Sequence, residues 1–126
     1  AFDLAWNYSG IFGLTGVFSG ALWWRSKAYD VDKPDANRIL HTQVEQAKQL
    51  PKLRYWFQAG TLDEKEDRNN NGVIDAIDDT LHLIKALESR GYHPKNDLHY
   101  HEVKGGKHNP KTWAKVLPNF FRWALA

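Results

Sequence analysis

The sequence predicts an α/β fold, a three-layer αβα arrangement in which helices cover both faces of a parallel sheet. Segments with helical periodicity alternate with short apolar runs along the chain, in the order helix, strand, helix, strand, helix, strand, helix. This alternation is typical of right-handed β-α-β units, which place parallel strands side by side. The 126 residues are enough for one domain with a single core.

The first half of the chain contains two predicted helices and two predicted strands. Apolar side chains recur at helical spacing over Ala1–Tyr8, and Leu14–Leu22 follows as a mostly apolar run that is typical of a buried parallel strand. Asp35 is expected to cap a helix over Ala36–Gln49. Lys52–Gly60 is rich in aromatic and apolar residues and is the clearest strand.

The second half repeats the pattern of helix and strand. A leucine-rich stripe predicts a helix over Asp79–Arg90, and Gly91 is placed where a helix commonly stops. Leu98–Val103 alternates apolar and polar residues, as a strand does. A last helix is expected over Lys111–Leu125, with Pro118 either kinking it or dividing it in two.

Composition excludes several classes of function. The 17 basic and 15 acidic residues leave a net charge of +2 and are scattered, so neither a nucleic-acid footprint nor a membrane surface is supported as a partner. No apolar run is long enough for a membrane span. The absence of cysteine excludes disulfides and thiol chemistry and leaves the compartment open, although we favour a periplasmic or secreted location.

The segment Asp67–Asp78 has the spacing of a twelve-residue calcium loop, with Gly72 at the sixth position, where such a loop turns sharply. Calcium binds six to eight oxygen atoms, and alternate residues of a tight loop can direct that many inward. The expected ligands are Asp67, Asn69, Asn71, Val73 through its carbonyl, Asp75 and Asp78. The alternative is an acidic surface turn rich in Asn and Gly. We expect a structural Ca²⁺ that braces the loop after Asp63.

A carboxylate and an imidazole follow two consecutive predicted strands. Asp63 lies just past the strand Lys52–Gly60, and His108 lies just past the strand Leu98–Val103. Because the carboxyl ends of parallel strands meet at one edge of the sheet, these side chains should lie close together. Such a pair can form the acid and base of a nucleophilic triad, with Glu64 as the alternative acid. Without further support, two unrelated loop residues are the favoured interpretation.

Three blocks of sequence resemble the putative esterase family of α/β-hydrolases, the group of enterochelin-esterase-like and feruloyl-esterase-like enzymes. The blocks are Tyr8–Trp24, Ala59–Glu64, and Gly105–Asn109 with Trp113. The resemblance implies a serine carboxylic-ester hydrolase that acts on a small-molecule or glycan ester. It also implies that Asp63 is the triad acid and His108 the base.

One departure from the family pattern is important. The Gly-x-Ser-x-Gly elbow that carries the nucleophile does not occur, and Gly16–Gly20 has the wrong spacing. We therefore expect residues 1–126 to form a single partial α/β-hydrolase domain, the carboxyl-terminal half, with 67–78 as a calcium-loop insertion and no activity alone. The strand Leu14–Leu22 would then have an open edge, which favours a homo-oligomer or association with the missing half.

Six tryptophans raise the question of a ligand platform, because flat apolar rings suit sugar and acyl groups. Trp23, Trp24 and Trp113 follow predicted strand ends and are candidates for a substrate pocket, whereas Trp56 and Trp123 are expected in the core. The rival function is a non-catalytic, calcium-stabilised carbohydrate-binding module that retains the acid and base only as relics.

Overall fold

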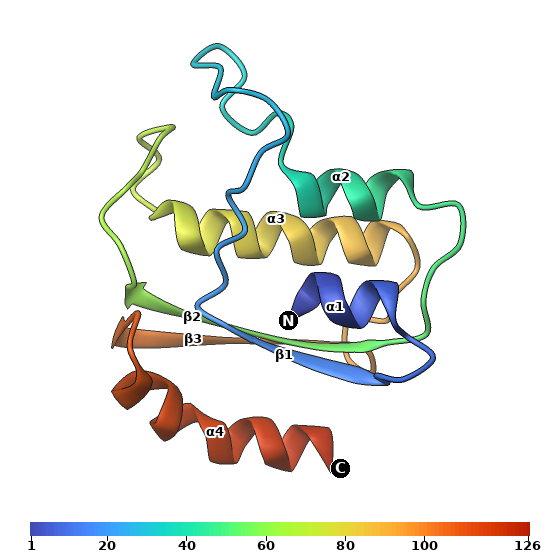
Figure 1. Cartoon of the computed structure of the whole chain (residues 1–126). Helices are drawn as coiled ribbons and strands as arrows, with labels where there is room; N and C mark the ends of the chain where they lie inside the picture. Colours follow the sequence, from blue (N-terminus) through green and yellow to red (C-terminus); the bar gives the residue numbers. More distant parts are fainter.

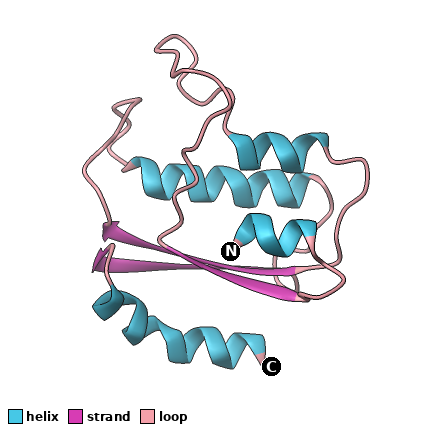
Figure 2. Cartoon of the chain, viewed as in Figure 1, coloured by secondary structure: helices cyan, strands magenta, loops and turns pink.

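A sheet of three parallel strands forms the middle layer of the protein, between three helices on one face and a single helix on the other (Figures 1 and 2). The computed structural model describes residues 1–126. The strands, in their spatial order, are β1 (Leu14–Phe18), β2 (Arg54–Leu62) and β3 (Leu98–Lys107). The helices are α1 (Phe2–Asn7), α2 (Ile39–Gln46) and α3 (Asp75–Ser89) above the sheet, and α4 (Pro110–Ala124) below it. The predicted three-layer α/β fold is confirmed.

The central strand β2 is buried on both faces, which explains its near-continuous apolar sequence. Its residues from Tyr55 to Gly60 are all buried. Tyr55 stacks on Phe2 of α1 at a ring distance of 5.5 Å, on the upper face. Trp56 points the other way and meets Phe120 of α4 at 5.8 Å. Burial of each such aromatic side chain stabilises the fold by roughly 1.5–3 kcal/mol. Strand β2 therefore holds the helices on both faces to the sheet.

Several element boundaries differ from the sequence prediction. Helix α2 begins at Ile39 rather than Ala36, and Asp35 does not cap it. Asp35 instead accepts a hydrogen bond from Arg68 at 3.2 Å, and an extended backbone at Arg38 delays the helix. Helix α3 begins at Asp75, one turn earlier than predicted, because its first turn contributes buried side chains to the fold.

The strand boundaries also shift. Strand β1 stops at Phe18 rather than Leu22, because Ser19 adopts a left-handed backbone with φ of 48° that ends the extended conformation. Strand β3 continues past Val103 to Lys107. Helix α4 runs through Pro118 as one element, so the prediction that it divides there is wrong. None of the helices combines the length and apolar character that a membrane crossing requires.

A buried ion-pair network joins α3 to the loops on either side of it. Asp79, 1% exposed, accepts hydrogen bonds from Arg38 at 2.6 Å and from both guanidinium nitrogens of Arg68. Arg68 also bonds Asp35. Burial alone would raise the pKa of the Asp79 carboxyl, but hydrogen bonds and charge from Arg68 and Arg38 outweigh burial and lower this pKa.

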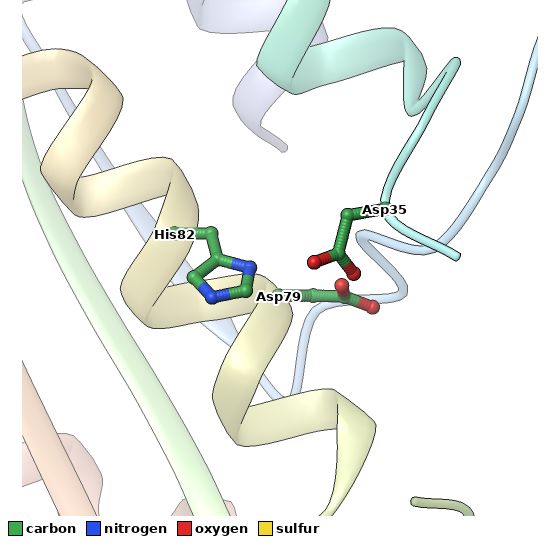
Figure 3. A group of neighbouring side chains, drawn as sticks. All are labelled: Asp35, Asp79 and His82. Atoms are coloured by element: carbon green, nitrogen blue, oxygen red, sulfur yellow. The ribbon is translucent and has the colours of Figure 1, made fainter. Parts of the chain in front are cut away.

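The same network contains three side chains that together resemble a metal site. Figure 3 shows Asp35 and Asp79 pointing toward each other, with the His82 ring beside them on α3. Arg38 and Arg68 supply the positive charge that this acidic group needs, and Arg38 lies 3.1 Å from the His82 ring nitrogen. A cation would have to displace both guanidinium groups, so we assign no metal here.

The side chain of His41, in α2, contacts the backbone of α3. Its Nε2 lies 2.8 Å from the Asp79 carbonyl, so this nitrogen carries the proton, and Nδ1 is buried without a partner. Burial, followed by the charge of Arg38, lowers the pKa of His41 to about 4 from 6.5. Between these two pH values the unfolded chain binds more protons at this histidine, so acidification across that range destabilises the fold.

Strand β1 forms one edge of the sheet and is open on its outer side. Gly13 and Ser19 bond β2, so the alternate residues Leu14, Gly16 and Phe18 direct their N–H and C=O groups outward. Exposed apolar side chains flank this edge, Leu4 on α1 and Leu117 on α4. The opposite edge, β3, carries exposed charged residues instead. Open apolar edges recruit other strands, whereas charged edges resist pairing.

We propose that the isolated chain associates with a second copy along β1. Sedimentation velocity over a range of concentrations is expected to show a dimer, and Leu117→Lys should shift it to monomer because the substitution places a charge beside the edge. Leu81→Lys on α3 is the matched control, since both leucines are 40% exposed. A wild-type chain that stays monomeric at every concentration would refute this pairing.

Removal of the Asp79 charge is expected to lower the stability of the fold much more than removal of the Asp35 charge. Asp79→Asn removes the negative charge that two buried guanidinium groups share, and breaking such a pair typically costs about 3–5 kcal/mol of unfolding free energy. Asp35→Asn loses a bond to the same Arg68, but Asp35 is 43% exposed, so a change below about 1 kcal/mol is expected. Urea unfolding of both variants tests the ranking, and equal losses would contradict it.

Candidate active site

The carboxyl ends of the three parallel strands lie together at one end of the sheet (Figure 1). Asp63 directly follows β2, and His108 directly follows β3. Both line a single small cavity of about 60 Å³, together with Ser19, Glu64 and Trp23. The topology thus brings the two predicted residues to a common space, although no hydrogen bond joins them.

Asp63 has one carboxylate oxygen in use and one free. Its Oδ2 accepts the Gly60 N–H at 2.9 Å, and its own N–H donates to the Gly60 carbonyl at 3.1 Å, so the turn after β2 is tight. A Cβ at Gly60 would collide with the Gly106 carbonyl and with Asp63, so only glycine permits this approach. Oδ1 of Asp63 is buried without a hydrogen-bond partner. A buried acceptor of this kind costs free energy until a donor reaches it.

His108 has a fixed backbone and an unbonded side chain. The Lys107 N–H donates to the Thr112 hydroxyl at 3.0 Å, and the Asn109 N–H donates to the Lys107 carbonyl at 2.8 Å. Asn109 also caps α4 by accepting the Thr112 N–H at 3.0 Å. The exposed imidazole makes an edge-on contact with Trp113, at a ring distance of 5.3 Å and an angle of 71°.

Ser19 belongs to this site, although the sequence predicted it only as part of the strand Leu14–Leu22. It is buried, and its hydroxyl accepts the Trp113 indole N–H at 2.9 Å and donates to the Gln58 side chain at 3.4 Å. The one feature of the sequence that pointed to this residue was a serine at the end of an apolar run. Nothing in the sequence indicated its hydrogen bonds to Trp113 and Gln58.

Glu64, the alternative acid, has a different environment from Asp63. It lies between the cavity and a neighbouring groove and lines both. Burial raises the pKa of Glu64, the Ala76 backbone N–H opposes the rise, and the charges of Asp75 and Asp79 add to it. Glu64 therefore takes up a proton more readily than an ordinary glutamate.

The neighbouring groove has a volume of about 410 Å³ and opens beside the cavity. Trp23 lines both spaces, and Tyr29 adds a second aromatic wall to the groove. Trp24 stacks on Trp23 at 4.8 Å and is 59% exposed, so it supports Trp23 from the outside. Trp113 lies on the other side, in α4, where it lines an apolar hollow of about 330 Å³ with Phe18.

The loop Asp67–Asp78 folds back on itself. Asp67 accepts the N–H groups of Asn71 and Gly72, at 3.2 and 2.8 Å, and Gly72 has a φ of 83°. The Asn71 side chain donates to Asp78 at 2.7 Å, which brings the fifth and twelfth positions together.

Two ligand candidates of the loop have other contacts. Asp75 accepts the Arg68 N–H at 3.0 Å and lies 3.4 Å from the Arg68 guanidinium, so it faces the ion-pair network. Asn69 accepts the Asn71 N–H at 3.2 Å within the loop. Hydrogen bonds therefore connect Asp67, Asn69, Asn71 and Asp78 within one turn, with Asp75 at its border.

Comparison with known proteins assigns the family. A family model described as putative esterase matches residues 1–124. No curated protein and no solved structure gives a significant match. The family match spans nearly the whole chain, including the strand ends that carry Asp63 and His108. The chain therefore belongs to the putative esterase family.

Proposed function

We propose that this chain supplies the acid and the base for hydrolysis of carboxylic esters by a serine-type mechanism. The observation that carries the proposal is the cavity that both Asp63 and His108 line, together with a buried oxygen of Asp63 that has no hydrogen-bond partner. Membership of an esterase family gives the reaction class. Each of these features alone occurs in many proteins, but their combination at the carboxyl edge of a parallel sheet favours catalysis.

The two residues have distinct roles in this mechanism. His108 takes the proton of the attacking serine hydroxyl and then gives it to the departing alcohol. Asp63 accepts the other imidazole N–H through Oδ1, which fixes the tautomer and stabilises the imidazolium as it forms. Hydrogen bonds of this kind are often long before substrate binds, so the absence of the bond is compatible with the role.

The nucleophile comes from outside these 126 residues in our proposal. The chain has four serines, and none lies in a Gly-x-Ser-x-Gly elbow. Ser19 is the serine that lines the cavity, but its buried hydroxyl is bonded to Trp113 and Gln58 rather than to His108. The chain alone should therefore lack esterase activity.

The groove beside the cavity suits one of the two groups, acyl or alcohol, of a small-molecule or glycan ester. Trp23 and Tyr29 offer apolar ring faces, and Glu64 and Glu66 offer hydrogen-bond acceptors. Arg68, in contrast, is occupied by three carboxylates. A bound group would therefore stack on the aromatic wall and donate hydrogen bonds to the glutamates.

Catalysis is tested in the polypeptide that joins this chain to a serine elbow, with p-nitrophenyl acetate as substrate. His108→Gln and Asp63→Asn should each lower kcat/KM by about 10³-fold or more, because each removes a triad member. Glu64→Gln is the matched control and should change the rate only a few-fold. The reverse ranking of the two carboxylates would make Glu64 the acid. Full activity of His108→Gln would refute His108 as the base, and a wild-type polypeptide without activity would instead favour the non-catalytic carbohydrate-binding module.

We also propose that the loop Asp67–Asp78 binds a structural Ca²⁺. The side chains of Asp67, Asn69, Asn71 and Asp78, with the Val73 carbonyl, would hold the ion, and Asp75 would join through its border position. Gly72 provides the left-handed turn that a calcium loop needs at its sixth position. A bound ion would stiffen the segment between Asp63 and α3.

Removal of the metal tests this site. A ligand that binds only the folded state stabilises it by about 2.7 kcal/mol at 100 times its Kd, so excess EGTA should lower the Tm and added Ca²⁺ should restore it. Asp67→Asn should weaken this response, whereas Asp32→Asn, an exposed carboxylate outside the loop, should keep it. Identical melting curves with chelator and with Ca²⁺ would exclude the site.

A further inference from the structure

Trp113 contacts the imidazole of His108, the predicted base. Its ring meets the His108 imidazole edge to face at 5.3 Å, and this is the one aromatic contact that the imidazole makes. Such a pair is worth roughly 0.5–1.5 kcal/mol, which is enough to favour one ring orientation over others on an exposed side chain. No hydrogen bond to the imidazole competes with this contact.

Trp113 is itself held by the end of β1. Its indole N–H donates to the Ser19 hydroxyl at 2.9 Å, across 94 positions in the sequence. Ser19 is 5% exposed and has a φ of 48°, a strained conformation for a residue other than glycine. Its own N–H donates to the Gln58 carbonyl at 2.8 Å, and its hydroxyl donates to the Gln58 side chain. The Ser19 hydroxyl is therefore held by Gln58 of β2, independently of the hydrogen bond that it accepts from the Trp113 indole.

These contacts form a continuous chain from the central strand to the imidazole. Gln58 is 1% exposed and fixes Ser19, Ser19 fixes the Trp113 ring, and the Trp113 ring lies against His108. The backbone of His108 is separately pinned by the turn around Lys107 and Asn109. The remaining freedom of His108 is the rotation of its side chain, which is the freedom that a ring contact restricts.

We propose that Trp113 is a positioning residue that orients the His108 imidazole, and that Ser19 anchors Trp113 for this purpose. This inference rests on the proposed role of His108 as the base. In this role Trp113 acts through His108, whereas a residue that lines the substrate pocket would act on the substrate directly. The anchoring role of Ser19 also explains why a polar serine is buried at the end of β1.

Nuclear magnetic resonance of the 126-residue chain tests the inference without any catalytic assay. The His108 ring signals are identified by their loss in His108→Gln. Trp113→Leu should remove the ring-current shift of these signals and the nuclear Overhauser effects to the indole, and it should average the side-chain torsion. Trp24→Leu is the matched control, because Trp24 is exposed and stacks on Trp23 rather than on His108. His108 signals that are unchanged in Trp113→Leu would overturn the proposal.

The anchor is tested by two milder variants, which also decide the question if Trp113→Leu fails to fold. Ser19→Ala and Trp113→Phe each remove the bond between the indole and the hydroxyl, so both should displace the His108 signals in the same direction. The double variant should resemble either single one, because the same bond is lost. Displacements that simply add, or no displacement in Ser19→Ala, would refute the anchor.

Failure of the base assignment would look different. In the polypeptide that carries the serine elbow, His108→Gln should abolish esterase activity. Retained activity of His108→Gln would undermine the proposed function while leaving the contact with Trp113 intact. No change in Trp113→Leu would undermine the positioning role while leaving the pair intact.

Discussion

The buried carboxylate of Asp79 is the interaction on which the active-site edge depends. It receives Arg38 from the loop before α2 and Arg68 from the loop before α3, and the Asp79 backbone carbonyl receives His41. The start of α2 and the loop before α3 are thereby both fixed to the first turns of α3. Asp79 also lines the cavity that Asp63 and His108 share, so the charge network forms one wall of the site. Removal of one member would leave buried charge uncompensated, which makes the arrangement cooperative.

The central strand supplies the second constraint. Its two faces carry different aromatic sets, so β2 is held between the upper core and α4 and cannot slip by one residue without exposing both. A fixed register determines where β2 and β3 end relative to each other. Gly60 and Gly106 then allow the backbones to approach closely at that end, where Asp63 turns back on itself. The position of Asp63 is thus a consequence of packing along the whole strand.

The site combines a rigid frame with two unsatisfied groups. Asp63 keeps a buried oxygen without a donor, and His108 keeps an imidazole without a hydrogen bond. Buried polar atoms without partners are uncommon in folded proteins, and they are concentrated at functional sites because catalysis needs groups that are free to react. Trp113 and Ser19 restrict the imidazole from one side, while Trp23 and Glu64 connect the cavity to the groove. The chain belongs to the putative esterase family.

The sequence by itself determined the order of the elements, the parallel sheet, the stop at Gly91 and the meeting of Asp63 with His108 at one edge. These follow from local periodicity and from the rule that the carboxyl ends of parallel strands coincide. The tertiary structure alone decided that Arg38 and Arg68 share Asp79, that Asp35 leaves α2 uncapped, and that Ser19 binds Trp113. Such contacts join residues that are up to 94 positions apart, and they depend on strand register and helix placement, for which short-range patterns carry no signal.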